Sequence, residues 1–165
     1  MNIIELLLTE LEREAQVTRK MLALVLTEKM DWAPHEKSMK MKDLAVHIAE
    51  LPTWVSMAIN TNELDFASEP YNPSPVSNAA DLVALFEKSY EDGRTTLSKT
   101  NEDELTKSWV LRSGDQIYAT MTKYETIRHA YSQTIHHRAQ LGVYLRLLNI
   151  PIPGSYGPSA DDQSF

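Results

Sequence analysis

Two histidines of this 165-residue chain have the spacing that a shared chemical site needs. His47 and His137 each fall in a row of apolar residues three and four positions apart, in two segments far apart in the sequence. This spacing predicts that both imidazoles lie on the inward faces of helices. An imidazole binds divalent metals and exchanges protons near neutral pH, so the two are candidate metal ligands. The alternative is that each is a core histidine hydrogen-bonded to a hydroxyl or carbonyl group.

The segment that contains His137 offers three further candidate ligands. Gln133 lies four residues before His137, and His129 lies four residues before Gln133, so the three side chains share one helical face. His136 is rotated by about 100° from His137, so only one of that pair can point fully at the interior. Imidazoles from this helix and from the helix of His47 could meet in the core of a bundle, where metal sites are built from facing helices.

Composition limits the kinds of chemistry that are available. The chain has no cysteine, which excludes disulfides, thiolate nucleophiles, iron–sulfur clusters and cysteine-based zinc sites. Sixteen basic against 23 acidic residues give a net charge of −7, which disfavours binding to nucleic acids or to anionic membrane surfaces. No apolar run is long enough to span a membrane, and the N-terminus has no basic signal pattern. We therefore expect a soluble, cytoplasmic protein, with no nucleic acid and no membrane as partner.

Four long segments with helical periodicity must position these residues. They cover about residues 3–26, 41–59, 79–97 and 122–148, with Asn78 as the expected N-cap of the third and Pro52 as a kink within the second. The pattern predicts an all-α four-helix bundle in a single domain, residues 1–165, with a short hairpin or extended loop at 108–119 between the third and fourth helices. Exposed apolar faces on long helices favour a homodimer.

Two of these segments also resemble a known family. The run His136-His137-Arg138-Ala139-Gln140-Leu141, followed by Tyr144-Leu145-Arg146, resembles the signature of the DinB/YfiT-like superfamily of bacterial metal-binding four-helix proteins. The segment 44–51 is similar to the family's histidine-containing segment in the second helix, and residues 150–161 are similar to an extension of one branch. The order and spacing of the helices fit as well, so the resemblance covers nearly the whole chain.

The resemblance implies a divalent metal, zinc or nickel, held by three histidines. One comes from the second helix and two, four residues apart, come from the fourth. His47 matches the first position and His137 the last, but the middle position is Gln133. An amide oxygen binds such metals more weakly than an imidazole does. Three outcomes are open: Gln133 is a ligand through its oxygen, His129 or His136 replaces it after a local rotation of the helix, or the site has decayed into a polar pocket.

The resemblance further implies a metal-dependent enzyme that acts on a small molecule. Family members of assigned activity look like transferases that activate a low-molecular-weight thiol, or like hydrolases. The alternative is a non-catalytic or metal-free binding or dimerisation protein in which the histidine triad has been lost. The sequence specifies neither the catalytic residues nor the substrate.

Overall fold

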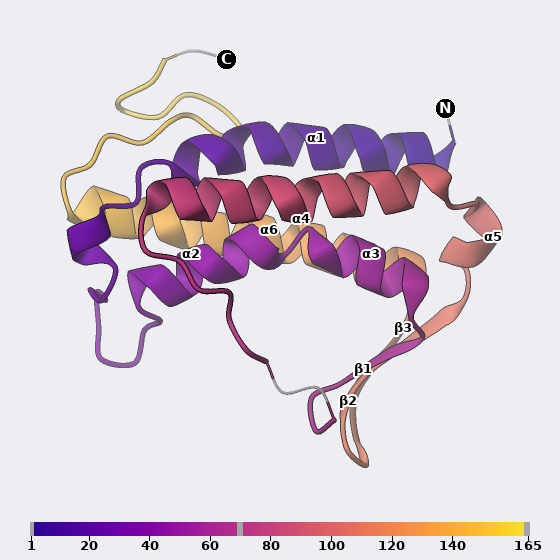
Figure 1. The fold of residues 1–165 in the computed structure, drawn as a ribbon. Coiled ribbons are helices and arrows are strands. Elements are labelled where there is room, and N and C mark those ends of the chain that lie inside the picture. Colours follow the sequence, from indigo (N-terminus) through magenta and orange to yellow (C-terminus); the bar gives the residue numbers. More distant parts are fainter. Residues whose placement is uncertain (1, 69–70, 164–165) are drawn as a thin grey trace.

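Four helical rods lie side by side in the computed structural model, which describes residues 2–68 and 71–163 (Figure 1). The rods are α1 (Ile3–Leu22), the pair α2 (Met41–Glu50) and α3 (Thr53–Asn60), α4 (Ala79–Lys99) and α6 (Lys123–Leu147). The rod α1 packs against α4 and α6, and so does the α2–α3 rod. The α1 rod and the α2–α3 rod are therefore diagonally opposite in the bundle. Met1 and residues 164–165, at the ends of the predicted domain, lie outside the described residues.

Side-chain caps define where the long helices begin. Asn2 at the start of α1 and Thr122 at the start of α6 each accept a hydrogen bond from a backbone N–H of the first turn, and Glu5 and Glu125 close the two capping boxes. Asn78 caps α4 in the same way, which confirms the predicted N-cap. Local sequence signals therefore fix the starting points of three of the four rods.

The second rod is interrupted at Pro52. The sequence predicts one kinked helix here, but α2 ends at Glu50 and α3 begins at Thr53. Proline lacks a backbone N–H and crowds the preceding turn. The backbone at the break forms hydrogen bonds of the 3₁₀ type, between residues three positions apart. One runs from the N–H of Trp54 to the carbonyl of Leu51, at 3.1 Å. Both α2 and α3 pack against α4 and α6, so the two helices together occupy one position in the bundle.

A three-stranded mixed sheet extends from one end of the bundle. Strands β2 (Ser108–Ser113) and β3 (Gln116–Thr122) form the expected hairpin, and β1 (Glu63–Asp65) pairs with β2 in parallel, with Leu64 opposite Leu111. The prediction of an all-α four-helix bundle is therefore wrong. The described residues form six α-helices and this sheet, with 57% helix and 10% strand. A strand of three residues has no periodicity of its own, and its pairing depends on a segment distant in sequence.

The sheet is joined to the bundle by buried side chains. Trp109 of β2 is fully buried, and its indole N–H donates to the hydroxyl of Thr61 at 3.0 Å. The ammonium of Lys123, 2% exposed, donates to the carbonyl of Ile59 at 2.8 Å and to Glu104 at 2.6 Å. Glu104 belongs to α5 (Glu102–Leu105), a short helix between the predicted third and fourth helical segments. These contacts fix the sheet beside the end of α3 and the start of α6.

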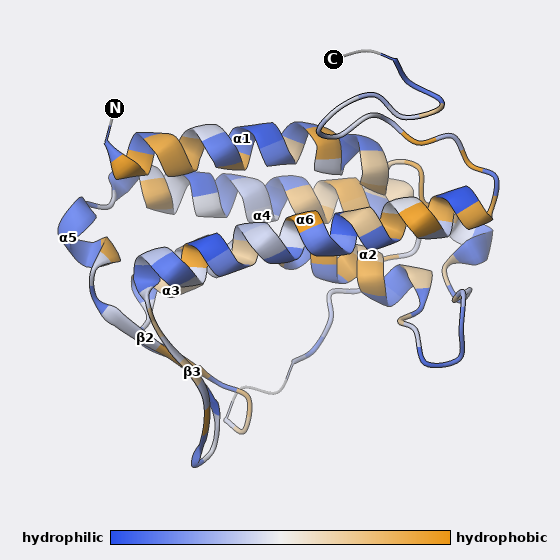
Figure 2. Ribbon diagram, turned by 180° about the vertical axis from the view of Figure 1, so that it is seen from behind, coloured by the Kyte–Doolittle hydropathy of each residue, from blue (hydrophilic) through white to orange (hydrophobic). Residues whose placement is uncertain are grey.

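The C-terminal segment runs back along the bundle and lies near α1 (Figure 1). Asn149, with a φ of 59°, ends α6, and Asp161 then accepts hydrogen bonds from Arg146 and from the backbone N–H of Ile152. Hydrophobic residues gather toward the C-terminal end of α6 (Figure 2), where this segment covers part of the helix. In the described part of the chain, none of the helices has the length and apolar character needed to cross a membrane.

Candidate functional site

The structure brings His47 and His137 together across the α2–α6 interface. Their ring centroids are 4.7 Å apart and their planes meet at 80°. His136 contacts His137 with a centroid distance of 4.9 Å but is itself exposed, as expected for neighbouring residues of one helix. Two imidazoles on separate rods thus form the centre of the candidate site, which we call the histidine pair (His47 and His137).

Both members of the histidine pair are neutral at neutral pH. Burial is the main cause that lowers the pKa of His47 below 6.5, and the nearby ring of His137 lowers it further while Glu50 acts in the opposite direction. Burial also lowers the pKa of His137, against a hydrogen bond with Gln140 that raises it. The neutral imidazole is the form that binds a metal ion.

The orientation of His137 is set by its neighbour one turn further along α6. Its Nδ1 lies 2.8 Å from the side-chain oxygen of Gln140. A carbonyl oxygen can only accept, so Nδ1 is the protonated nitrogen in this contact and Nε2 keeps its lone pair. Metal-binding histidines are commonly fixed by such a hydrogen bond from the second ring nitrogen.

The other two predicted ligands contact each other instead of the histidine pair. The side-chain nitrogen of Gln133 lies 3.4 Å from Nε2 of His129, and the ring of His129 lies 6.3 Å from that of Trp54 on α3. Both side chains are half-buried on the same face of α6 as His137. The predicted ligands are therefore on one side of the molecule, in two contacts: His47 with His137, and His129 with Gln133.

The residues near the histidine pair form a nitrogen and oxygen donor set. Within residues 2–68 and 71–163, no three side chains among histidine, cysteine, aspartate and glutamate are grouped as a metal site. Two neutral imidazoles and the amide oxygen of Gln133, one turn before His137, suit an intermediate divalent ion such as zinc, with water in the remaining positions. This set fits a weakly held ion with open coordination positions.

Glu50 connects the histidine pair to a cavity of about 510 Å³ between α3, α4 and the segment that follows β1. Its carboxylate acts on the pKa of His47 and also lines the cavity wall. Trp54, which contacts His129, lines the same cavity. A space suited to a small molecule therefore shares Glu50 and Trp54 with the surroundings of the candidate ligands, although neither His47 nor His137 lines it.

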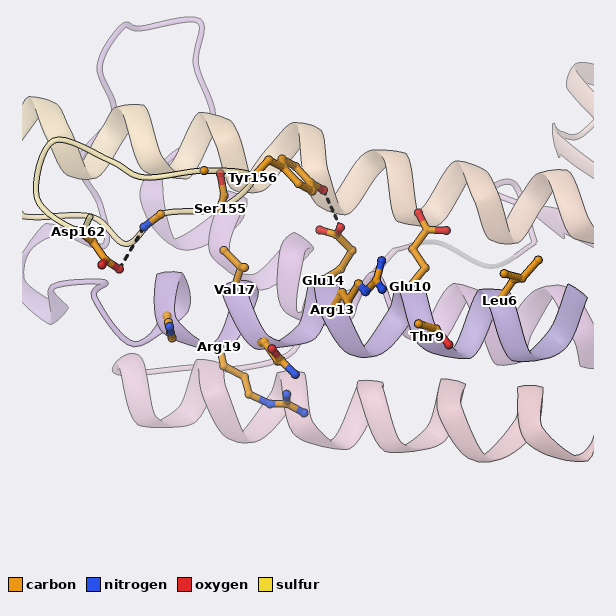
Figure 3. A pocket seen from close by; sticks show the side chains of 14 residues that line it. Leu6, Thr9, Glu10, Arg13, Glu14, Val17, Arg19, Ser155, Tyr156 and Asp162 are labelled. Atoms are coloured by element: carbon orange, nitrogen blue, oxygen red, sulfur yellow. Dashed lines mark hydrogen bonds between the residues drawn. The ribbon is translucent and has the colours of Figure 1, made fainter. Parts of the chain in front are cut away.

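A larger hollow lies on another part of the surface, between α1 and the C-terminal segment (Figure 3). There the hydroxyl of Tyr156 points at Glu14 and donates to its Oε1 at 2.6 Å, and Asp162 accepts from the backbone N–H of Gly154 at 3.4 Å. Glu14 also pairs with the buried guanidinium of Arg138 at 2.7 Å. These polar groups bind one another, so the hollow is a seam where the C-terminal segment packs.

Sequence reasoning missed two site residues, Lys88 and Asp92, which line the cavity from α4. Their spacing of four residues was the available signal, but the same spacing is common on solvent-facing helix surfaces. Trp54 and Glu50 were detectable as members of the helical face that contains His47. Only the packing of α3 against α4 shows that all four surround one cavity.

Comparisons with known proteins agree with this architecture. The model of the DinB family matches residues 1–164. A DinB-like protein from Bacillus subtilis has a TM-score of 0.71 at 17% identity, over 90% of this chain and 96% of that one. A DinB-like protein from Bacillus cereus has a TM-score of 0.68 at 20% identity, over 91% of this chain and 95% of that one.

A third structure, a mycothiol-dependent maleylpyruvate isomerase, has a TM-score of 0.60 at 17% identity. The similar region covers 86% of this chain but only 61% of the isomerase. At these identities, all three similarities demonstrate a shared fold. No curated protein matches the chain.

Proposed function

This chain belongs to the DinB family, and from that membership we propose that it is an enzyme that acts on a small molecule at the histidine pair. In this proposal His47, His137 and the amide oxygen of Gln133 hold a divalent metal ion, zinc or nickel. The observation that supports it most directly is the 4.7 Å separation of the two rings, which come from different rods. The reaction class is thiol transfer or hydrolysis.

A metal ion bound there supplies a Lewis acid that lowers the pKa of a coordinated water or thiol. The protein residues have the tasks of binding and orientation. Gln140 fixes the ring of His137 so that Nε2 is available, and burial keeps both imidazoles unprotonated. Because the chain has no cysteine, a thiol nucleophile must arrive as a second substrate. The similar fold of a mycothiol-dependent isomerase supports the thiol version of the reaction.

Metal content tests the proposal. Protein purified without a histidine tag should contain near-stoichiometric zinc or nickel by elemental analysis, or should take it up when the ion is added. H47A and H137A should each lose the metal, because each removes one of two imidazole ligands. H35A is the matched control, since His35 lies in the connection before α2 and its Nδ1 accepts from the backbone N–H of Lys37. A wild-type protein that neither contains nor binds metal would overturn the proposal.

Gln133→His tests the third position. An imidazole there completes the three-histidine set, so the affinity for zinc should rise by roughly tenfold or more. Competition with a chromophoric chelator measures the change. An unchanged affinity would show that residue 133 does not face the ion.

A second candidate function is metal-free binding of a small molecule by the same fold. Two observations favour it: Gln133 contacts His129 in place of the histidine pair, and the described residues contain no group of three strong ligands. In that case neither the wild type nor H47A takes up metal, and the Q133H variant is the one that binds it. The elemental analysis therefore separates the two candidates.

A further inference from the structure

The cavity that Glu50 and Trp54 line has the size and the lining of a small-molecule site. Its volume is about 510 Å³, within the range of roughly 300–1,000 Å³ typical of ligand pockets. It lies between α3 and α4, and the segment after β1 closes its third side. Its apolar and aromatic lining comprises Trp54, Met57, Leu64, Phe66 and Leu85.

Two opposite charges on α4, both on exposed side chains, line this cavity without pairing with each other. Lys88 and Asp92 are one helical turn apart, and both line the cavity. Asp92 accepts a hydrogen bond from the hydroxyl of Ser56 on α3. Over the described ranges 2–68 and 71–163, the ammonium of Lys88 makes no ion pair or hydrogen bond. A lysine four residues before an aspartate is the less favourable order for a helical ion pair, which is consistent with the unpaired state.

The remaining carboxylate of the cavity is already used by the protein. Glu50 accepts from the hydroxyl of Tyr71 at 2.7 Å, and from the backbone N–H and the hydroxyl of Ser74 at 3.0 and 2.6 Å. These three hydrogen bonds tie the cavity wall to α2. Burial and the contact with Glu50 raise the pKa of Tyr71, so its hydroxyl remains a donor. The charged side chains of the cavity that are not held by several hydrogen bonds are therefore Lys88 and Asp92, which accepts one from Ser56.

We infer that this cavity binds an apolar α-amino acid in its zwitterionic form. The ligand carboxylate pairs with Lys88, the ligand ammonium pairs with Asp92, and the apolar side chain packs against Trp54 and Phe66. A ligand with both charges forms two ion pairs with the protein, whereas a simple acid or amine forms only one of them and leaves the other protein group in water. That such an amino acid is the substrate of the enzyme rests on the proposed function. That the cavity binds it does not require the metal.

Three matched probes test the inference on the full-length chain: phenylalanine, 3-phenylpropanoate, which lacks the ammonium, and phenethylamine, which lacks the carboxylate. Isothermal titration calorimetry in EDTA measures their binding, so that chelation of a metal by the amino acid makes no contribution. Phenylalanine should bind about tenfold or more tightly than either partial ligand, because only phenylalanine pairs both charges. Equal binding of the three probes, or no binding of phenylalanine, would refute the inference.

Two variants assign the charges to the residues. K88M keeps the apolar stem of the lysine. It should lower the affinity for phenylalanine about tenfold and leave the affinity for phenethylamine unchanged. D92N keeps an oxygen that can accept a hydrogen bond from Ser56. It should lower the affinity for phenylalanine and leave the affinity for 3-phenylpropanoate unchanged. K99M, at the exposed end of the same helix, is the matched control and should bind all probes as the wild type does.

Thermal unfolding verifies that each variant is folded, and a folded K88M or D92N that binds phenylalanine normally would contradict the assignment. The metal content of the wild type is measured separately. Metal without phenylalanine binding would reject only this inference, and phenylalanine binding without metal would reject only the proposed function.

Discussion

At the scale of single residues, Arg138 shows how neighbouring side chains of one helix can have different environments. His137 faces α2, whereas Arg138 is 2% exposed and pairs with Glu14 of α1 at 2.7 Å. Its guanidinium also donates to the carbonyl of Glu14 and to the hydroxyl of Thr18, at 3.0 and 3.1 Å. The two residues thus link α6 to opposite rods, since successive side chains are rotated by about 100°.

Removing Glu14 should destabilise the protein strongly. E14A leaves the guanidinium of Arg138 buried without its counter-charge, a change that typically costs about 3–5 kcal/mol. The double variant E14A/R138M should recover most of that loss, because methionine fills similar space without a charge. Guanidinium chloride denaturation measures the free energy of unfolding of the wild type, E14A and E14A/R138M. A single variant as stable as the wild type would show that the pair contributes no net stability.

At the scale of elements, a glycine sets the approach of α3 to α4. A Cβ placed on Gly93 would lie 2.5 Å from the carbonyl oxygen of Pro52 and 3.3 Å from the Cβ of Val55. The first of these atoms belongs to the backbone at the break between α2 and α3, so a side-chain rotation cannot relieve the clash. Gly93 therefore permits the close packing that places both α3 and α4 around the ligand cavity.

The variant G93A should destabilise the protein by about 1–3 kcal/mol through overpacking, although alanine is the better helix former. Gly142 of α6 provides the matched control. A Cβ at that position would meet only the flexible end of Met21 at 3.4 Å and Ile152 at 3.8 Å. G142A should therefore be neutral or stabilising by up to about 1 kcal/mol. Thermal unfolding compares the stability of G93A and G142A with that of the wild type. Equal changes in stability for the two variants would contradict the packing explanation.

The elements of the site differ in how far the sequence predicts them. The inward faces of α2 and α6 follow from apolar spacing around His47 and His137, and the structure brings these residues together. Pro52 predicts a disturbance of the second helix by itself, but the strand β1 depends on its pairing with β2, which has no local signal. For the same reason, the cavity residues on α4 were not predicted.

At the scale of the whole molecule, the acidic balance makes stability depend on pH. Hydrogen bonds from the backbone of Gly114 and Ala67 lower the pKa of Asp65, and contacts with Lys107 and Lys123 lower that of Glu104. As pH falls through the ordinary values of 4.5 and 3.8, the unfolded chain binds more protons than the folded one. The lowered pKa values of the histidine pair act in the same direction, starting below 6.5.

The denaturation midpoint should therefore fall as pH decreases from 7, slowly at first and then more steeply below 4.5. D65N should be less stable than the wild type at pH 7, because it loses a charged acceptor for Gly114 and Ala67. The difference should narrow at low pH, where Asp65 of the wild type becomes protonated as well. Guanidinium chloride titrations between pH 7 and 3 measure both trends, and a midpoint that rises on acidification would contradict them.

By itself, the sequence determined the four long helical segments, the cap at Asn78, the hairpin, and the inward positions of His47 and His137. These features follow from local periodicity and capping, which act within a few residues. Only the tertiary structure decided the parallel pairing of β1, the separate contact between Gln133 and His129, and the cavity with unpaired Lys88 and Asp92. Each of these depends on which distant segments pack together, and that is set by burial across the whole chain.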